Sequence, residues 1–264
     1  MDTLAVCVAG ATGWTGRAVA QGALRSPDVR LRSAVSRRAA GGDLGESWGG
    51  ARVDVPVFAQ VADALDGVDV LIDYTAPDAV LDNVLAAVER GVHVVVGTSG
   101  LSAEQYARID ERARERGVGV IASGNFSITA ALLQAAALLA ARHLPQWEIV
   151  DYAGAGKPDA PSGTARELAE RLGEVRTPTP AIDTVGVAGA RGAEIGGAQT
   201  HSVRLPGYTL AVEAIFGLPG ERLSLRHEAG ESAEPYVAGT LMAARLAPGR
   251  VGVTRGLDTL LLEP

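Results

Sequence analysis

This sequence of 264 residues has little cysteine, no long apolar run and no block of basic residues. Its one cysteine, Cys7, has no second cysteine in the chain to pair with, so a secreted domain stabilised by disulfides is excluded. The protein is expected in the reducing environment of the cytoplasm. No apolar run approaches the roughly 20 residues of a membrane span, and no positively charged leader precedes the first strand-like run. The net charge of −7 argues against nucleic-acid binding. We therefore expect a soluble, cytoplasmic protein that binds neither membranes nor nucleic acids.

Short β-branched runs alternate with longer helical stretches in the first half of the chain. This alternation predicts right-handed βαβ crossovers and a buried parallel sheet. The expected strands cover residues 4–8, 29–35, 68–72, 92–96 and 118–121, and the expected helices cover residues 15–24, 78–90 and 103–116. Ser102 and Gln105 have the spacing of a capping box at the start of the third helix. Together these elements predict a nucleotide-binding domain over residues 1–125.

The second half of the chain has a different character. It begins with an alanine-rich and leucine-rich helix at residues 128–143, and another helix is expected after Ser162. Strand-like runs cover residues 148–152, 182–187, 201–204, 208–216 and 223–227. Because most of the turns between them are short and contain Gly or Pro, we expect a mixed or antiparallel sheet with helices on one face. The fold class is therefore α/β, with a parallel-sheet domain followed by an α+β domain with a mixed sheet.

A glycine-rich loop joins the first expected strand to the first expected helix. It consists of Gly10, Ala11, Thr12, Gly13, Trp14, Thr15 and Gly16. Backbone amides at a helix start, together with the helix dipole, can hold a pyrophosphate that glycines allow to approach closely. The spacing is GxxGxxG rather than GxGxxG, so a tight turn without a ligand is the alternative. The βαβ context favours a dinucleotide.

The end of the second strand indicates which dinucleotide is bound. Proteins that prefer NAD usually place a carboxylate there, about 20 residues after the glycine loop, to bind the ribose 2′-hydroxyl. This chain instead has Ser36, Arg37 and Arg38. Two guanidinium groups and a small hydroxyl suit a 2′-phosphate, so NADPH is expected as the cofactor. If the arginines are merely solvated, NADH is the alternative.

Lysine occurs once among the 24 basic residues, at Lys157. Lysine can give up a proton, whereas arginine effectively cannot. Near a hydride-transfer site, an ammonium group can protonate the atom beside the one that accepts hydride, or it can polarise an imine. A lone lysine in a loop can also be an accident of codon usage, so the surrounding residues decide between the two interpretations.

Lys157 opens the segment KPDAPSGTA, which leads into the helical pattern RELAERL. Ser162 is suited to cap this helix, and the backbone amides around Gly163 and Thr164 form a site for a carboxylate. A candidate general acid and a candidate anion site therefore lie close together in the sequence. This combination favours an anionic substrate over a purely structural loop.

Several segments resemble those of the 4-hydroxy-tetrahydrodipicolinate reductase family, also called dihydrodipicolinate reductase, which acts in bacterial diaminopimelate and lysine biosynthesis. They are the opening VAGATG loop, DYTAP at residues 73–77, GTSG at 97–100, NFS at 125–127, Lys157 with DAPSGT, and HSVRLPG at 201–207. The resemblance covers essentially the whole chain, and few other families carry K-x-DAPSGT. It implies a Rossmann-like domain over residues 1–125, with a C-terminal helix within 234–264 packed back on it. It also implies a substrate-binding domain over residues 126–233 that forms homotetramers.

The resemblance further implies roles for individual residues. Hydride would pass from NAD(P)H to a cyclic, unsaturated dicarboxylate of the imine type, with Lys157 as the proton donor. Ser162, Gly163 and Thr164 would hold a carboxylate of this small-molecule substrate. The residues implied to bind the cofactor are Gly10, Ala11, Thr12, Gly13, Trp14, Thr15, Gly16, Arg37, Thr75, Gly97, Thr98, Ser123 and Asn125.

One departure from the family pattern lies just before the lysine. The family carries a His-His pair four and three residues before it, one histidine proposed as a proton relay and the other helping to hold the substrate. This chain has Ala153 and Gly154 at these positions, and neither side chain can relay a proton or bind a substrate through a hydrogen bond. Tyr152 can supply a hydroxyl nearby, whereas His201 and His227 lie in strand-like runs, where structural roles are expected.

Three functions therefore stay open. The first is NADPH-dependent reduction of 4-hydroxy-tetrahydrodipicolinate to tetrahydrodipicolinate, with Lys157 alone or a bound water supplying the proton. The others are a reductase of a different cyclic imine acid and a non-catalytic NADPH-binding homologue. A short-chain dehydrogenase is excluded, because its Tyr-x-x-x-Lys motif needs a tyrosine where Ala153 stands. No His, Cys and carboxylate cluster has metal-ligand spacing, so no metal is expected.

Overall fold

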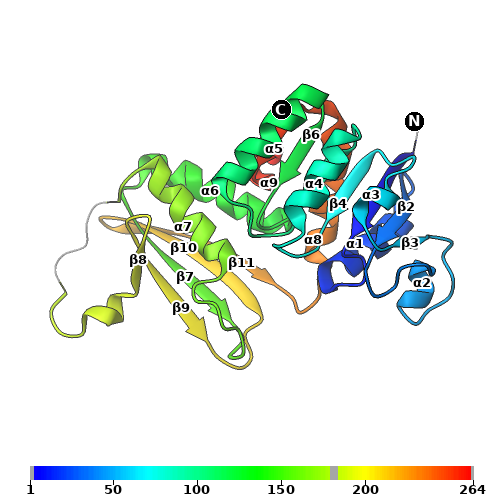
Figure 1. Cartoon of the computed structure of the whole chain (residues 1–264). Coiled ribbons are helices and arrows are strands. Elements are labelled where there is room, and N and C mark those ends of the chain that lie inside the picture. The colour runs from blue at the N-terminus through cyan, green and yellow to red at the C-terminus, as the bar shows by residue number, and fades with distance from the viewer. Residues whose placement is uncertain (1–2, 179–183, 263–264) are drawn as a thin grey trace. The chain divides into compact units, whose positions relative to one another are not determined.

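The computed structural model describes residues 3–178 and 184–262 (Figure 1). The chain divides into two compact units. The first contains the described residues up to Ile128 and those from Ala233 onward, and the second runs from Thr129 to Ser232. Among the described helices, none is long and apolar enough to cross a membrane.

The first unit is built on a seven-stranded sheet in the order β12-β6-β5-β4-β1-β2-β3, with every pair of neighbouring strands parallel. Its strands are β1 (Leu4–Ala9), β2 (Val29–Val35), β3 (Val57–Phe58), β4 (Val70–Asp73), β5 (His93–Val96), β6 (Gly119–Ala122) and β12 (Gly252–Arg255). Its helices are α1 (Trp14–Arg25), α2 (Leu44–Ser47), α3 (Val61–Ala64), α4 (Val80–Glu89), α5 (Ala103–Arg116), α8 (Pro235–Leu246) and α9 (Leu257–Leu262), with a 3₁₀ turn at Ala247–Gly249. The expected Rossmann-like parallel sheet is confirmed.

The local signals in this unit act as their chemistry predicts. The capping box of α5 is present: the hydroxyl of Ser102 accepts the backbone N–H of Gln105, whose side chain accepts the N–H of Ser102. The helix ends at Gly117, which has a φ of +67°, a conformation that glycine adopts without strain. All four residues of β4 are buried, as are those of β6, because helices cover both faces of a parallel sheet.

The C-terminal segment contains the helix expected within residues 234–264 and a strand that was not expected. Only Pro235–Leu246 is the predicted helix, and β12 follows it and pairs with β6 at the edge of the sheet. Residues 263 and 264 lie outside the described part of the chain. The short run Gly252–Arg255 has a glycine at its start and weak alternation, so its sequence gave little sign of a strand.

The second unit is built on a five-stranded sheet in the order β11-β10-β7-β9-β8. The β7–β9 pair is parallel and the other pairs are antiparallel, so the expected mixed sheet is confirmed. Its elements are α6 (Ile128–His143), β7 (Gln146–Ala153), α7 (Gly163–Val175), a 3₁₀ turn at Ala188–Arg191, β8 (Ala193–Ile195), β9 (Ala198–Arg204), β10 (Leu210–Leu218) and β11 (Glu221–Ala229). Of the strand expected over 182–187, residues 184–187 do not form one, and 182 and 183 lie outside the described residues.

The two faces of this second sheet differ. Alternate residues of β7, Trp147 and Ile149 among them, join the apolar core that α6 and α7 share with the sheet. The residues between them are only partly buried and, with their neighbours on β10, form what we call the open face, represented by Glu148, Val150, Tyr152, Glu213 and Ile215. This alternation places neighbouring residues of one strand in different surroundings.

Candidate active site

The glycine loop makes a tight turn between β1 and α1. Gly10 has a φ of +78°, and a Cβ atom on it would lie 2.1 Å from the carbonyl oxygen of Tyr74. A Cβ atom on Gly16 would lie 2.2 Å from the carbonyl oxygen of Gly10. Gly13 is the N-cap of α1 and has no side chain that could occupy the helix start. These glycines therefore leave the first turn of α1 open to an anion such as a pyrophosphate.

A pocket of about 730 Å³ lies beside this loop in the first unit. Five of the residues predicted to bind the cofactor line it: Gly10, Thr12, Gly13, Arg37 and Thr75. The remaining predicted residues are not among its lining residues: Ala11, Trp14, Thr15, Gly16, Gly97, Thr98, Ser123 and Asn125. Gln60, Asp82 and Asn83 also line it and were not predicted, because they follow no motif of the glycine loop. The volume and the glycine-lined wall fit the phosphate and adenosine portions of a dinucleotide.

The end of β2 is joined to the glycine loop. The hydroxyls of Thr12 and Ser36 lie 2.8 Å apart, within hydrogen-bond distance. Ser36 is buried, whereas Arg37 and Arg38 are exposed and line the same pocket. Two positive charges therefore stand beside the pocket.

A buried carboxylate, that of Asp73 at the end of β4, organises two of the predicted residues. Its Oδ1 accepts hydrogen bonds from the hydroxyl of Thr98 at 2.6 Å, and from the hydroxyl and backbone N–H of Thr75 at 2.7 and 3.0 Å. Its Oδ2 accepts one from the side-chain amide of Asn83 at 2.8 Å. Asp73 is fully buried, so these bonds replace the water that the charge would otherwise bind.

The other predicted cofactor residues have local partners. A Cβ atom on Gly97 would lie 2.2 Å from the ring of Tyr74, so only glycine fits beneath that ring. The hydroxyl of Ser123 donates to the carbonyl oxygen of Asn125 at 2.8 Å and accepts the Asn125 N–H at 3.3 Å. Trp14 is 58% exposed at the start of α1, with its ring against the edge of Tyr236.

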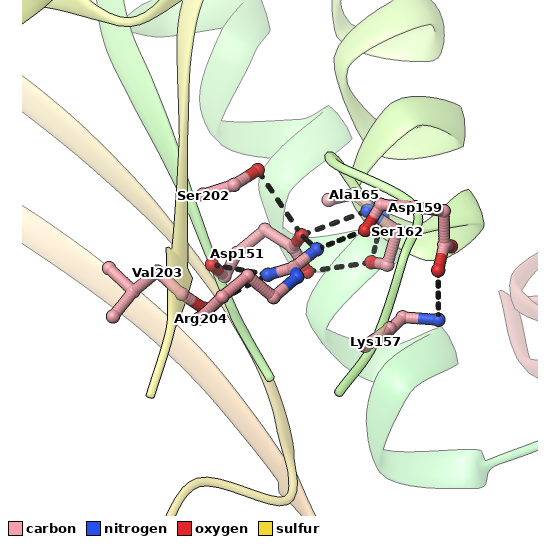
Figure 2. A network of polar contacts seen from close by, with 8 residues as sticks. All are labelled: Asp151, Lys157, Asp159, Ser162, Ala165, Ser202, Val203 and Arg204. Carbon is pink, nitrogen blue, oxygen red and sulfur yellow. Dashed lines mark hydrogen bonds and ion pairs between the residues drawn. The ribbon is translucent and has the colours of Figure 1, made fainter. Parts of the chain in front are cut away.

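Lys157 and the start of α7 belong to the second unit (Figure 2). The ammonium of Lys157 lies 2.8 Å from Oδ1 of Asp159, and this hydrogen bond lowers the pKa of the Asp159 carboxyl below its ordinary value. Ser162 caps α7, its hydroxyl accepting the backbone N–H of Ala165 at 3.4 Å. Gly163 and Thr164 form the first turn of that helix. The structure thus brings the predicted proton donor and the predicted carboxylate site into one loop-and-helix segment.

A second buried carboxylate, that of Asp151 on β7, was not among the predicted site residues. Its Oδ1 accepts the hydroxyl of Ser162 at 2.7 Å, and its Oδ2 accepts the Ser162 N–H at 2.8 Å. Arg204 on β9 donates to Oδ2 at 2.6 Å and also to the carbonyl oxygen of Asp159 at 2.6 Å (Figure 2). The HSVRLPG segment contained the only sequence signal for Arg204, and it did not reveal the partner.

The positions of the missing histidine pair are closely packed. Ala153 is fully buried on β7, on the same face as Asp151. A Cβ atom on Gly154 would lie 3.2 Å from the carbonyl oxygen of Tyr208, so even alanine would be tight there. The two small residues therefore match their surroundings in this chain.

Three further candidates have partners in the second unit. The hydroxyl of Tyr152 donates to Glu213 at 3.3 Å on the open face, opposite to Asp151, and its supply of a hydroxyl to a substrate stays a prediction. His201 lies 2.9 Å from Glu148. The Nδ1 of His227 lies 3.0 Å from the hydroxyl of Thr129, and burial lowers the pKa of this histidine.

The parallel sheet, its glycine loop and the pocket beside it define a Rossmann-type dinucleotide-binding domain. Residues 4–126 match the family model described as dihydrodipicolinate reductase, N-terminus, and residues 127–261 match the one described as dihydrodipicolinate reductase, C-terminus. The chain belongs to the dihydrodipicolinate reductase family. The resemblance stated from its motifs is thereby confirmed.

Individual relatives agree with this assignment. The 4-hydroxy-tetrahydrodipicolinate reductase of Moorella thermoacetica is 38% identical over 265 residues, which cover 98% of each chain. That of Thermosynechococcus vestitus is 37% identical over 271 residues, covering 98% of this chain and 97% of its own. Among solved structures, a dipicolinate-bound dihydrodipicolinate reductase from Paenisporosarcina sp. TG-14 has a TM-score of 0.87 at 28% identity and covers 98% of this chain and 99% of its own. An amine dehydrogenase from Mycobacterium smegmatis, 17% identical with a TM-score of 0.66 over 98% of this chain and 96% of its own, shares the fold.

Proposed function

We propose that this protein reduces 4-hydroxy-tetrahydrodipicolinate to tetrahydrodipicolinate with NADPH, and that Lys157 supplies the proton. The observation that carries the proposal is the segment from Lys157 to Thr164, in which one ammonium group precedes a capped helix start. An ammonium and a helix N-terminus both attract carboxylates, and the substrate is a dicarboxylate.

The reaction exchanges a hydroxyl group for hydrogen. The substrate loses one molecule of water and gains a hydride and a proton, which yields the reduced product and the oxidised dinucleotide. A bound dinucleotide supplies the hydride. The protein's own task is to hold the dicarboxylate and to place a proton donor at the ring atom next to the one that accepts the hydride, a role that is typically worth about 10²- to 10⁴-fold in rate.

The segment around Lys157 divides these tasks. The ammonium of Lys157 is the proton donor, and its side chain is 30% exposed, which leaves it accessible to a ligand. The first turn of α7, which begins with Gly163 and Thr164 after the capping residue Ser162, binds a substrate carboxylate. Asp159 shares the ammonium through a partly exposed ion pair, which a substrate carboxylate can replace at small cost. Lys157 therefore acts without the histidine pair that the family pattern provides.

NADPH is proposed in preference to NADH because of the charge at one side of the pocket. Arg37 and Arg38 line it together with the buried Ser36, and the described lining residues at this end of β2 include no carboxylate. A ribose with a free 2′-hydroxyl is usually bound by a carboxylate, and a 2′-phosphate by arginine. The glycine loop from Gly10 to Gly16 would hold the pyrophosphate, and Thr75, Gly97, Thr98, Ser123 and Asn125 would serve the nicotinamide half.

We also propose that the protein works as a homotetramer in the cytoplasm and that the open face of the second sheet supplies the contact. In the described part of the second unit, α6 and α7 pack on the other face only. Val150 and Ile215 are partly buried apolar residues of the open face, next to the charged Glu148 and Glu213. An uncovered face with apolar residues among polar ones is typical of a surface that pairs with another copy.

The experiment that tests the reaction follows NADPH oxidation by absorbance. The condensation product of pyruvate and aspartate semialdehyde is supplied as the substrate, beside a panel of other cyclic imine acids. We expect rapid oxidation with the first and little with the others. Oxidation only with another imine acid would replace the proposed substrate, and oxidation with none, despite NADPH binding, would make the protein a non-catalytic binder.

A further inference from the structure

The hydrogen bonds of Ser162 limit what this residue can do for a substrate. A serine has one hydroxyl proton and one backbone N–H to donate. Both are donated to the carboxylate of Asp151, at 2.7 and 2.8 Å, while the hydroxyl oxygen also accepts the N–H of Ala165 (Figure 2). Ser162 therefore has no donor left for a substrate carboxylate in this arrangement, and its contribution is to fix where α7 begins.

Arg204 connects the same carboxylate to the Lys157 end of the segment. One of its terminal nitrogens bonds both Oδ2 of Asp151 and the carbonyl oxygen of Asp159, each at 2.6 Å. The side chain of Asp159 in turn holds the ammonium of Lys157. A chain of direct contacts thus runs from the helix start, through Asp151 and Arg204, to the residue that pairs with the proton donor (Figure 2).

The Asp151–Arg204 ion pair is largely buried. The side chain of Asp151 is 2% exposed and that of Arg204 is 15% exposed. The Nε of Arg204 is buried without a hydrogen-bond partner among the described residues. The contacts of its terminal nitrogens therefore set the orientation of the guanidinium, although this orientation leaves Nε without a partner. A buried ion pair adds little net stability, but removal of one partner is costly because it leaves the other charge buried and unpaired. Such a pair is therefore suited to holding its neighbours in one geometry.

We propose that Asp151 and Arg204 form a positioning pair for the reductase site: Asp151 sets the start of α7 through Ser162, and Arg204 sets the Lys157 end through the backbone of Asp159. This inference rests on the proposed function, because it concerns how the proton donor and the carboxylate site are held at a fixed separation. Neither residue needs to touch the substrate. Displacement of a reacting group by about 1 Å can cost on the order of 100-fold in rate, so loss of the pair should be felt in catalysis.

Variants of the full-length protein test the pair. Asp151→Asn keeps the shape of the side chain but removes the charge and places an amide donor where an acceptor stands, and Arg204→Lys keeps the charge but loses the planar fork. Ile149→Val is the matched control, because Ile149 lies on the same face of β7, two residues away, in the apolar core. For each protein we would measure kcat, the KM of the substrate, the Kd of NADPH, the Kd of dipicolinate as a planar dicarboxylate probe, and the melting temperature.

We expect Asp151→Asn to lower kcat at least tenfold and to raise the Kd of dipicolinate at least tenfold, with the Kd of NADPH changed less than twofold. Arg204→Lys should show a smaller loss in kcat and the same unchanged NADPH affinity. Ile149→Val should lower the melting temperature and leave the kinetic constants within twofold.

Two outcomes overturn the positioning pair. One is a folded Asp151→Asn protein with kcat and dipicolinate affinity within twofold of the wild type. The other is an equal catalytic loss in Ile149→Val, which would indicate general destabilisation. If Asp151→Asn does not fold, the same criteria for kcat and dipicolinate affinity are applied to Arg204→Lys. Failure of the proposed function looks different, because the wild-type protein itself would then not oxidise NADPH with the substrate.

Discussion

The hydroxyl of Thr98 lies 2.6 Å from Oδ1 of Asp73, the same oxygen that accepts the hydroxyl of Thr75. This one buried atom therefore joins the segments that follow two neighbouring strands, β4 and β5. In parallel sheets, ligands bind at the carboxyl ends of the strands, where such segments meet. The Asp73 carboxylate holds both segments in one arrangement beside the glycine loop.

Replacement of this carboxylate should weaken cofactor binding. Asp73→Asn removes the charge that four donor groups share, and a buried donor left without an acceptor costs about 1–3 kcal/mol. We expect a lower melting temperature and an NADPH Kd raised roughly tenfold, which corresponds to about 1.4 kcal/mol. Fluorescence titration checks this, with the exposed Asp66→Asn as control. Unchanged NADPH affinity in a folded Asp73→Asn protein would show that the two segments do not serve the cofactor.

Arg37 should determine the preference between the two dinucleotides. A hydrogen bond to a charged group is worth about 1.5–3 kcal/mol, so Arg37→Ala should lower kcat/KM for NADPH by roughly 10- to 100-fold. The kcat/KM for NADH should change little, because that cofactor has no 2′-phosphate. Arg30→Ala is the matched control, since Arg30 is an exposed arginine near the other end of the same strand. An equal loss with both dinucleotides would place Arg37 against a part of the cofactor that they share.

The features that the sequence predicted well are those encoded by neighbouring residues. The capping box of Ser102 and Gln105 depends on residues three apart, and the glycine loop on seven consecutive residues. Likewise, continuous runs rich in Val, Ile and Leu are typical of strands buried on both faces of a parallel sheet. Such signals predicted the parallel sheet, the mixed sheet and the helix that begins after Ser162.

The features that the sequence did not predict depend on distant residues. Asp151 and Arg204 are 53 positions apart and meet because β7 and β9 are parallel neighbours, with Asp151 beside Ser202 and Ala153 beside Arg204. The register of this pairing is set by packing of the whole unit and by no local motif. The partner of Tyr152 was not predicted for the same reason, because its hydroxyl donates to Glu213, which is 61 positions away on β10.

Acidification should destabilise the protein through His93, which is partly buried, and His227, which is buried. Burial lowers the pKa values of His93 and His227 in the folded state below the ordinary value near 6.5. At pH values between the folded and unfolded pKa, the unfolded chain binds more protons than the folded one. The stability contributed by the two neutral histidines is therefore fully present above about pH 6.5 and is lost as the pH falls from there through the folded pKa. The melting temperature should therefore drop between pH 7.5 and 5.5, and the drop should be smaller in His227→Gln. An identical slope in that variant would contradict the role of His227.

The proposed tetramer should depend on the open face. Ile215 lies there, directly across from Glu148 of β7, and a lysine in its place would put a charge into the contact between copies. We expect Ile215→Lys to sediment as a smaller species than the wild type. Leu139→Lys, which changes a 58% exposed leucine on α6, should keep the wild-type mass and serves as the control. A tetramer that survives Ile215→Lys would place the contact on another surface.

Lys157 should be needed for its proton and for its charge, and two variants separate these. Lys157→Met removes both, so kcat should fall by roughly 10²- to 10⁴-fold and the KM of the substrate should rise. Lys157→Arg keeps a positive charge opposite Asp159 but cannot give up a proton, so it should keep most of the substrate affinity while kcat falls about as far. NADPH affinity should stay within twofold in both, because the glycine loop and Arg37 lie in the other unit. If Lys157→Arg retained the wild-type kcat, the proton would have to come from another donor, such as a bound water, and Lys157 would act through its charge alone.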